Sequence, residues 1–227
     1  MRHIEAEIAS ERNAPRNDDQ EIASNAAHSR NDDNYGNDGN DDRPKLYMLL
    51  VGSKAPKRNV EQHDYFFGIA SSLKDLVPEI KAFWPEAGAS IHVDGWREVN
   101  RVGNYAVKVG LKTTAMPSSE KKLFFINLGG YQTGKLEEQH YIVLTVQDDR
   151  VLAVQEAKKT VFFKSNTIKG AGSHIDEKYG VDVDDIYRIE DILPAAYKDK
   201  YQLEIDTAPP DLQDDEIHLG YFKLHKL

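Results

Sequence analysis

Four histidines in similar segments of this chain lie two residues away from a carboxylate. The pairs are Glu61 with His63, His92 with Asp94, Glu138 with His140, and His174 with Asp176. Side chains two positions apart on a β-strand point to the same face. Each pair therefore presents an imidazole and a carboxylate on one side if its segment is extended, and two converging pairs would assemble two imidazoles and two carboxylates.

Such a group of side chains suits two kinds of chemistry. Imidazole nitrogen and carboxylate oxygen are ligands for zinc, manganese and iron. The leading hypothesis is therefore a binding module that holds a small ligand or a divalent metal at these eight positions, with one site in each copy of an internal repeat. A carboxylate can also orient a histidine as a general base, which makes His63 and His140 the candidate catalytic residues of a hydrolase. Neither spacing fixes a metal geometry. The same residues could instead bond at strand ends in a purely structural or interaction subunit.

The pairs belong to a longer internal repetition. Residues 45–49 resemble residues 122–126, Gly52 corresponds to Gly129, and residues 61–63 correspond to residues 138–140, all at an offset of 77. If the offset then increases by five, residues 92–94 match residues 174–176, and Tyr105 matches Tyr187. Several landmarks in one order indicate an internal duplication.

Each copy shows a β-β-α-β-β pattern. Apolar runs predict strands near residues 46–51 and 123–128, and further strands follow the Glu-Gln-His segments. Ser72 with Asp75, and Asp148 or Asp149, are N-cap signals for one helix in each copy, although Pro78 should shorten or bend the first helix. The closing strands are predicted near Ile91 and residues 105–107, and near Val183 and residues 186–189.

The fold class that follows is α+β, with two tandem β-β-α-β-β repeats forming a pseudo-two-fold domain after a disordered N-terminal tail. The predicted boundaries are 1–44 for the Asn/Asp-rich tail, 45–111 and 122–193 for the repeats, and 194–227 for a C-terminal extension with strands near 201–206 and 216–224. A repeat of about seventy residues is small for an independent core. The two copies are therefore expected to share a core or a sheet.

Charge and composition restrict the partners. Residues 1–44 hold eleven acids and five Lys or Arg, whereas the remainder is nearly balanced, with twenty-seven acids and twenty-four bases. The folded part has no basic excess for phosphates, so no nucleic-acid partner is expected. The chain has no cysteine, which excludes disulfides and thiolate metal sites. No apolar run is long enough to cross a membrane, so a cytoplasmic protein without a membrane partner is expected, and self-association into a homo-oligomer is left open.

The repeated body resembles a bacterial family known as domain of unknown function 1543. The resemblance covers residues 45–193 and rests on six segments: 45–50, 59–64, 72–78, 81–85, 124–131 and 178–185. It implies the domain boundaries but carries no activity or catalytic residues to transfer.

Overall fold

Antiparallel strands dominate the fold. The computed structural model describes residues 42–113, 120–131, 136–160 and 183–227, and these residues form a mixed α/β structure with ten strands in three antiparallel sheets and a few short helices. All of them belong to one compact unit, residues 41–227. The predicted disorder of the tail falls on residues 1–41, which lie outside the described residues. No helix of the described part is long and apolar enough to span a membrane.

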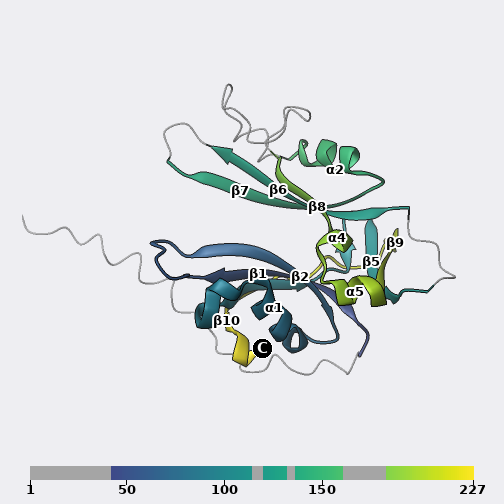
Figure 1. Ribbon diagram of the computed structural model, residues 1–227. Coiled ribbons are helices and arrows are strands. Elements are labelled where there is room, and N and C mark those ends of the chain that lie inside the picture. The colour runs from purple at the N-terminus through teal and green to yellow at the C-terminus, as the bar shows by residue number, and fades with distance from the viewer. Residues whose placement is uncertain (1–41, 114–119, 132–135, 161–182) are drawn as a thin grey trace, which may run out of the picture. The chain divides into compact units, whose positions relative to one another are not determined.

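The first half of the body, residues 45–111, is built around β1 (Lys45–Ser53). β1 pairs on one side with β2 (Gln62–Ala70) and on the other with β3 (His92–Glu98). β10 (His218–Lys223) joins from the C-terminal end of the chain and gives the strand order β10-β3-β1-β2 (Figure 1). The predicted C-terminal strand therefore completes the first sheet.

The second half, residues 122–193, has a similar sheet of three strands. β6 (Lys122–Tyr131) lies between β7 (Glu138–Gln147) and β8 (Val183–Arg188). A third sheet has the order β4-β5-β9, with β4 (Arg101–Val102), β5 (Tyr105–Leu111) and β9 (Tyr201–Thr207). It joins a strand of the first half to a strand that follows the second.

The two larger sheets have corresponding registers. In the first sheet Lys45 pairs with Ala70, and in the second sheet Lys122 pairs with Gln147. Lys122 lies 77 positions after Lys45, and Gln147 lies 77 positions after Ala70. The β1–β3 register shifts at a bulge between Leu50 and Val51, and the β6–β8 register shifts between Asn127 and Leu128, again 77 positions later.

The helices begin where the sequence predicts. Ser72 Oγ donates to Asp75 Oδ2 at 2.7 Å before the 3₁₀ turn η1 (Leu73–Leu76). The helix α1 (Val77–Phe83) carries Pro78 in its first turn, where the missing N–H costs no hydrogen bond. Asp149 Oδ1 accepts from Leu152 N at 2.9 Å and caps α2 (Arg150–Ala157). The shorter elements are η2 (Pro85–Ser90), α4 (Ile189–Ile192), α5 (Ala195–Lys200) and η3 (Leu224–Lys226).

Each larger sheet packs a helix on one face and contributes to a common core on the other. Tyr47, Leu49 and Val51 pack with Leu76 and Ile80 of the first helical segment. In the second sheet, residues of β6 pack with α2, namely Phe124, Ile126 and Leu128 with Ala153, Val154 and Ala157. The alternate residues of both sheets meet in one core that includes Leu46, Phe67, Ile69, Leu123, Phe125 and Val146. Phe125 contacts Tyr65 and Phe67 with ring centroids 5.5 and 5.3 Å apart.

Two sequence predictions are wrong in detail. The second half was expected to close with two strands near Val183 and residues 186–189, but β8 is one strand and Ile189 begins α4. Tyr105 and Tyr187 do not correspond, because Tyr187 lies on β8, which pairs with β6 as β3 pairs with β1, whereas Tyr105 lies on β5, which pairs with β9.

Candidate functional site

The four candidate residues of the first half converge where β1, β2 and β3 lie side by side. The register places Gly52 of β1 opposite His63 of β2 and opposite His92 of β3. Glu61 comes just before β2. Because Gly52 has no side chain, its two neighbours can approach over it.

These side chains, which we call the Gly52 cluster (Glu61, His63, His92 and Asp94), are in direct contact. His92 Nε2 lies 3.0 Å from Glu61 Oε1 and 3.2 Å from Asp94 Oδ1. His63 Nε2 lies 3.1 Å from Asp94 Oδ2. His92 is buried, whereas the side chains of His63 and Glu61 are 44% and 42% exposed. The cluster therefore has a buried base and an open rim.

The hydrogen bond of His92 determines which nitrogen faces the acids. Its Nδ1 lies 2.9 Å from the carbonyl oxygen of Ser90. A carbonyl can only accept, so Nδ1 carries the proton and donates it. In the neutral imidazole, Nε2 then presents a lone pair to two carboxylate oxygens. A proton or another positive charge at Nε2 would turn this repulsive contact into an attractive one.

The carbonyl of Ser90 is itself held in place. Ser90 Oγ donates to Ala87 O at 2.8 Å and lies 2.6 Å from Ser53 Oγ, which is fully buried. This network links the end of β1 to the turn before β3, and it fixes the tautomer of a histidine in the way that partners of metal-bound histidines do. The sequence reasoning did not identify Ser53 or Ser90, because nothing in their local pattern relates them to His92.

Asp94 owes its position to the β-bulge. Leu50 pairs with Gly95 and Val51 with Val93, so the register of β3 skips Asp94. Bulges often reorient one side chain beside a functional site. Asp94 Oδ2 is buried and has no aligned hydrogen-bond donor, although His63 Nε2 is near. The carboxylate thus retains bonding capacity that the protein does not use.

A C-terminal side chain closes one side of the cluster. The ring of Tyr221 on β10 packs on the imidazole of His92 with centroids 4.2 Å apart, and Tyr221 remains 63% exposed. Sequence reasoning missed Tyr221, because it lies 129 positions from His92 and only the β10–β3 pairing brings them together.

The second half does not assemble the same group from the described residues. His140 pairs with Gly129 as His63 pairs with Gly52, but its Nε2 lies 3.9 Å from Glu138 Oε2 and both side chains are at least one-third exposed. His174 and Asp176, the other two candidates, lie outside the described residues.

The register also corrects the expected match between the third strands. Tyr47 pairs with Glu98 in the first sheet, and Phe124, 77 positions after Tyr47, pairs with Arg188 in the second. The bulge leaves Asp94 out of the β1–β3 register and Asp184 out of the β6–β8 register. Residues of β8 therefore lie 90 positions after their counterparts on β3. The sequence comparison used an offset of 82, which is wrong for this strand. At an offset of 90, the counterpart of His92 is Asp182 rather than His174. The second copy therefore has an aspartate in the sequence position of the buried histidine.

No preformed metal cage is present in the described ranges. No group of three or more His, Cys, Asp or Glu side chains there is spaced to hold a metal ion. In the Gly52 cluster the donor atoms contact one another in pairs. An ion would have to separate them, and the exposed side chains of Glu61 and His63 have room to rotate outward.

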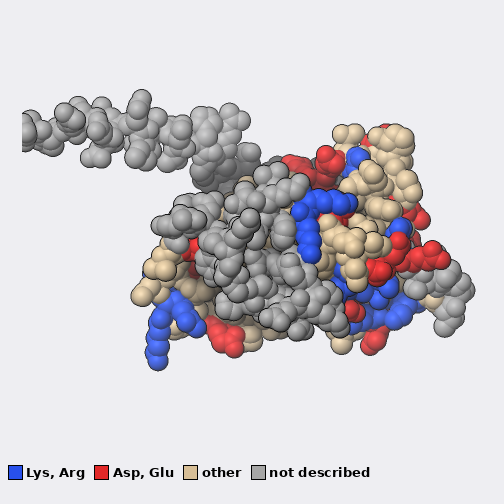
Figure 2. Space-filling model, turned by 90° about the horizontal axis from the view of Figure 1, so that it is seen from above, with Lys and Arg blue, Asp and Glu red and all other residues tan. Residues whose placement is uncertain are grey.

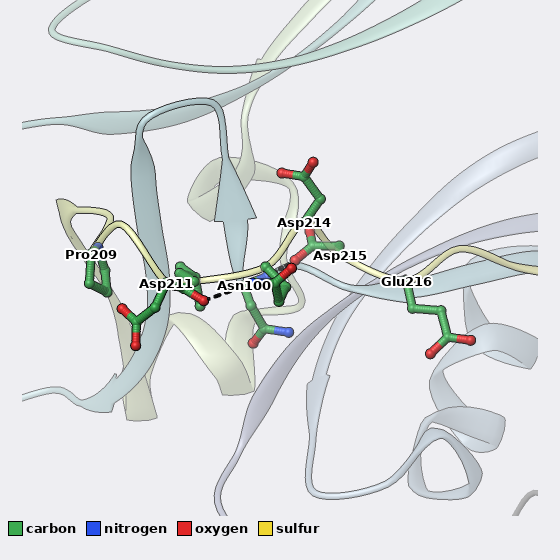
Figure 3. A pocket seen from close by; sticks show the side chains of 8 residues that line it. Asn100, Pro209, Asp211, Asp214, Asp215 and Glu216 are labelled. Atoms are coloured by element: carbon green, nitrogen blue, oxygen red, sulfur yellow. Dashed lines mark hydrogen bonds between the residues drawn. The ribbon is translucent and has the colours of Figure 1, made fainter.

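A pocket of about 480 Å³ lies elsewhere, along the segment before β10. Its acidic side chains do not converge: Figure 3 shows Asp211, Asp214 and Glu216 pointing in different directions. Asp215 instead anchors the segment, because its Oδ1 accepts from the backbone N–H groups of Asn100 and Arg101 at 3.0 and 2.9 Å. Burial raises the pKa of Asp215, and these two bonds oppose the rise.

A second pocket of similar volume lies between β7 and the β4–β5 turn. Neither of these two pockets is lined by a residue of the Gly52 cluster, whose exposed side chains are those of His63 and Glu61. Asp64 follows His63 in the sequence. Partial burial raises the pKa of Asp64, and the charge of Asp185 raises it further.

The face shown in Figure 2 mixes acidic and basic side chains where described residues are visible, in keeping with the balanced charge of the body.

Comparison with known proteins supports the predicted resemblance over part of the body. Residues 58–109 match the model of DUF1543, a Domain of Unknown Function. This DUF1543 segment runs from the residue before Asn59 to β5 and contains all four residues of the Gly52 cluster.

A solved structure shares the fold. The crystal structure of a protein Il1583 from Idiomarina loihiensis is 22% identical in sequence, with a TM-score of 0.52, and the match covers 80% of this chain and 98% of that one. At this identity the similarity concerns the fold alone. No curated protein matches the chain.

Proposed function

We propose that the protein is a binding module that holds a small cation, a divalent metal ion in the first instance, at the Gly52 cluster. The observation that carries this proposal is the orientation of His92. Its Nδ1 proton is directed to Ser90, so in the neutral imidazole Nε2 points its lone pair at the oxygens of Glu61 and Asp94, and a cation at Nε2 would turn these contacts into attractive ones. Two carboxylates with two neutral imidazoles carry two negative charges, which a divalent ion would balance.

The same charge argument disfavours an anion. A phosphate or carboxylate ligand would add negative charge beside Glu61 and Asp94, which repels it unless both histidines are protonated. Two nitrogen and two oxygen donors are a combination that zinc, manganese and iron accept.

The second half serves as an internal control for the proposed site, because His140 has different neighbours from His63. His63 and His140 occupy matching strand positions opposite Gly52 and Gly129. Of these two, His63 stands beside a buried histidine whose Nε2 faces carboxylates, and no such neighbour of His140 is found among the described residues. We therefore expect one strong site per chain.

Titration calorimetry with ZnCl₂ and MnCl₂, on protein without a histidine tag, tests the proposal. We expect one ion to bind per chain, and His63→Ala to weaken binding about tenfold or more, whereas the matched variant His140→Ala leaves it unchanged. Binding should release protons and weaken in acid, because the ligands must be deprotonated. Absence of binding, or equal losses in the two variants, would contradict the proposal.

We also infer that the body arose by duplication of one β-β-α-β-β unit. The equal registers of the β1–β2 and β6–β7 pairs, the bulges 77 positions apart and the skipped aspartates support this inference. The matched apolar residues of the common core, such as Leu46 and Leu123, support it as well. In this account β5 and β9 are equivalent strands, and their antiparallel pairing is the arrangement that a pseudo-two-fold axis produces.

A further inference from the structure

The outer edge of β10 combines exposed apolar side chains with an ordered distribution of charge. Ile217, Leu219 and Tyr221 are 62%, 77% and 63% exposed. Among the described residues β10 is the last strand of its sheet, paired only with β3. An edge strand presents backbone groups that can pair with another chain.

Charged residues flank the apolar stripe with opposite signs at its two ends. Asp214 and Glu216 precede the strand, with side chains 94% and 81% exposed. Lys223, His225 and Lys226 follow its centre and are also exposed. The order along the chain is acidic, apolar, basic.

We propose that β10 pairs antiparallel with β10 of a second copy of this chain. In an antiparallel pair of β10 strands centred near Gly220, the acidic end of each copy lies beside the basic end of the other copy. The stripe then meets itself, so that Leu219 and Tyr221 of one copy pack near the same residues of the other. Aliphatic and aromatic cross-strand pairs of this kind stabilise sheets, and a two-fold axis requires such a self-complementary surface. The two four-stranded sheets become one continuous sheet of eight strands.

β10 also has two features that are typical of sheet edges that do not pair with another chain. The β10–β3 register shifts between Leu219 and Phe222, and Lys223 lies near the end of the strand. Bulges and lysines are devices by which proteins protect edges from pairing. A protected edge, however, gains nothing from three exposed apolar side chains in alternation, whereas an interface does.

Charge reversal tests the proposal with two double variants of the full chain. One variant carries Asp214→Lys with Glu216→Lys, and the other carries Lys223→Glu with Lys226→Glu. Each variant alone should be monomeric in sedimentation velocity, because like charges meet at both ends of its interface. An equal mixture of the two should form a dimer, since every end then meets its opposite. The wild-type dimer should weaken as salt is raised.

Exposed leucines provide the matched control. Leu219→Asp should abolish the dimer, whereas Leu136→Asp, at a leucine that is also fully accessible, should leave it intact. Thermal unfolding of each variant establishes that it is folded. A wild-type chain that stays monomeric up to its solubility limit, or a dimer that none of these changes affects, would overturn the proposal.

Discussion

Leu123→Ala, a change in the second half, should lower the stability of the first half by about 2–5 kcal/mol, the usual cost of truncating a buried leucine. Leu123 is 1% exposed and lies in the core that both larger sheets share. The neighbouring Phe125 contacts Tyr65 and Phe67 of β2. The first sheet therefore depends on apolar partners from the second.

The tryptophans make this prediction measurable. The chain has two, Trp84 and Trp96, and both lie in the first half. In urea, the tryptophan fluorescence and the far-ultraviolet circular dichroism of Leu123→Ala should show one transition, at a lower midpoint than the wild type. The control Leu136→Ala removes a fully exposed side chain and should not shift it. An unshifted fluorescence transition in Leu123→Ala would mean that the halves fold separately.

Gly52→Ala should weaken divalent-ion binding roughly 10- to 100-fold, as changes to the supports of metal ligands commonly do. A Cβ atom at this position would lie 2.4 Å from Asp94 Oδ2 and 2.7 Å from His92 Nε2. Both contacts are too close, so the two donor groups must move apart or turn away. The methyl group therefore acts on the cluster without removing any of its four side chains.

Stability should change much less than binding in this variant. The atoms that must move are the ends of side chains, and displacing a side chain from its rotamer costs about 1 kcal/mol. Calorimetric titration and thermal unfolding of the same sample separate the two effects. Gly129→Ala, at the matching position of the second sheet, should leave ion binding unchanged. Normal binding by Gly52→Ala would show that the ion does not use the donors above Gly52.

The sequence predicts the local elements well because their signals are local. The apolar runs around Leu49 and Ile126, and the caps at Ser72 and Asp149, each lie within a few residues of the structure they specify. The pairs of the first half do meet, through the contacts of Glu61 with His92 and of His63 with Asp94, although Glu61 lies just before β2 and not within it. Gly52 could also have been recognised, since it corresponds to Gly129 at the same offset as the strands.

Long-range relations were not predictable from the sequence. The segment between α2 and β8 is longer than its counterpart in the first half. No local pattern gives its length, so His92 was matched to His174, whereas the offset of 90 found for β8 leads in the sequence to Asp182. The pairing of β10 with β3 depends on residues more than a hundred positions apart. The role of Ser90 is likewise invisible, because its contribution is a backbone carbonyl.

The most direct test of the cation site is a long-range ¹H–¹⁵N spectrum of the histidine rings, recorded with and without stoichiometric Zn²⁺. The structure requires His92 to carry its proton on Nδ1, where Ser90 accepts it. Zn²⁺ should shift the Nε2 resonances of His92 and His63 and leave those of His140 in place. Unchanged His92 and His63 resonances in the presence of Zn²⁺ would contradict the proposed site.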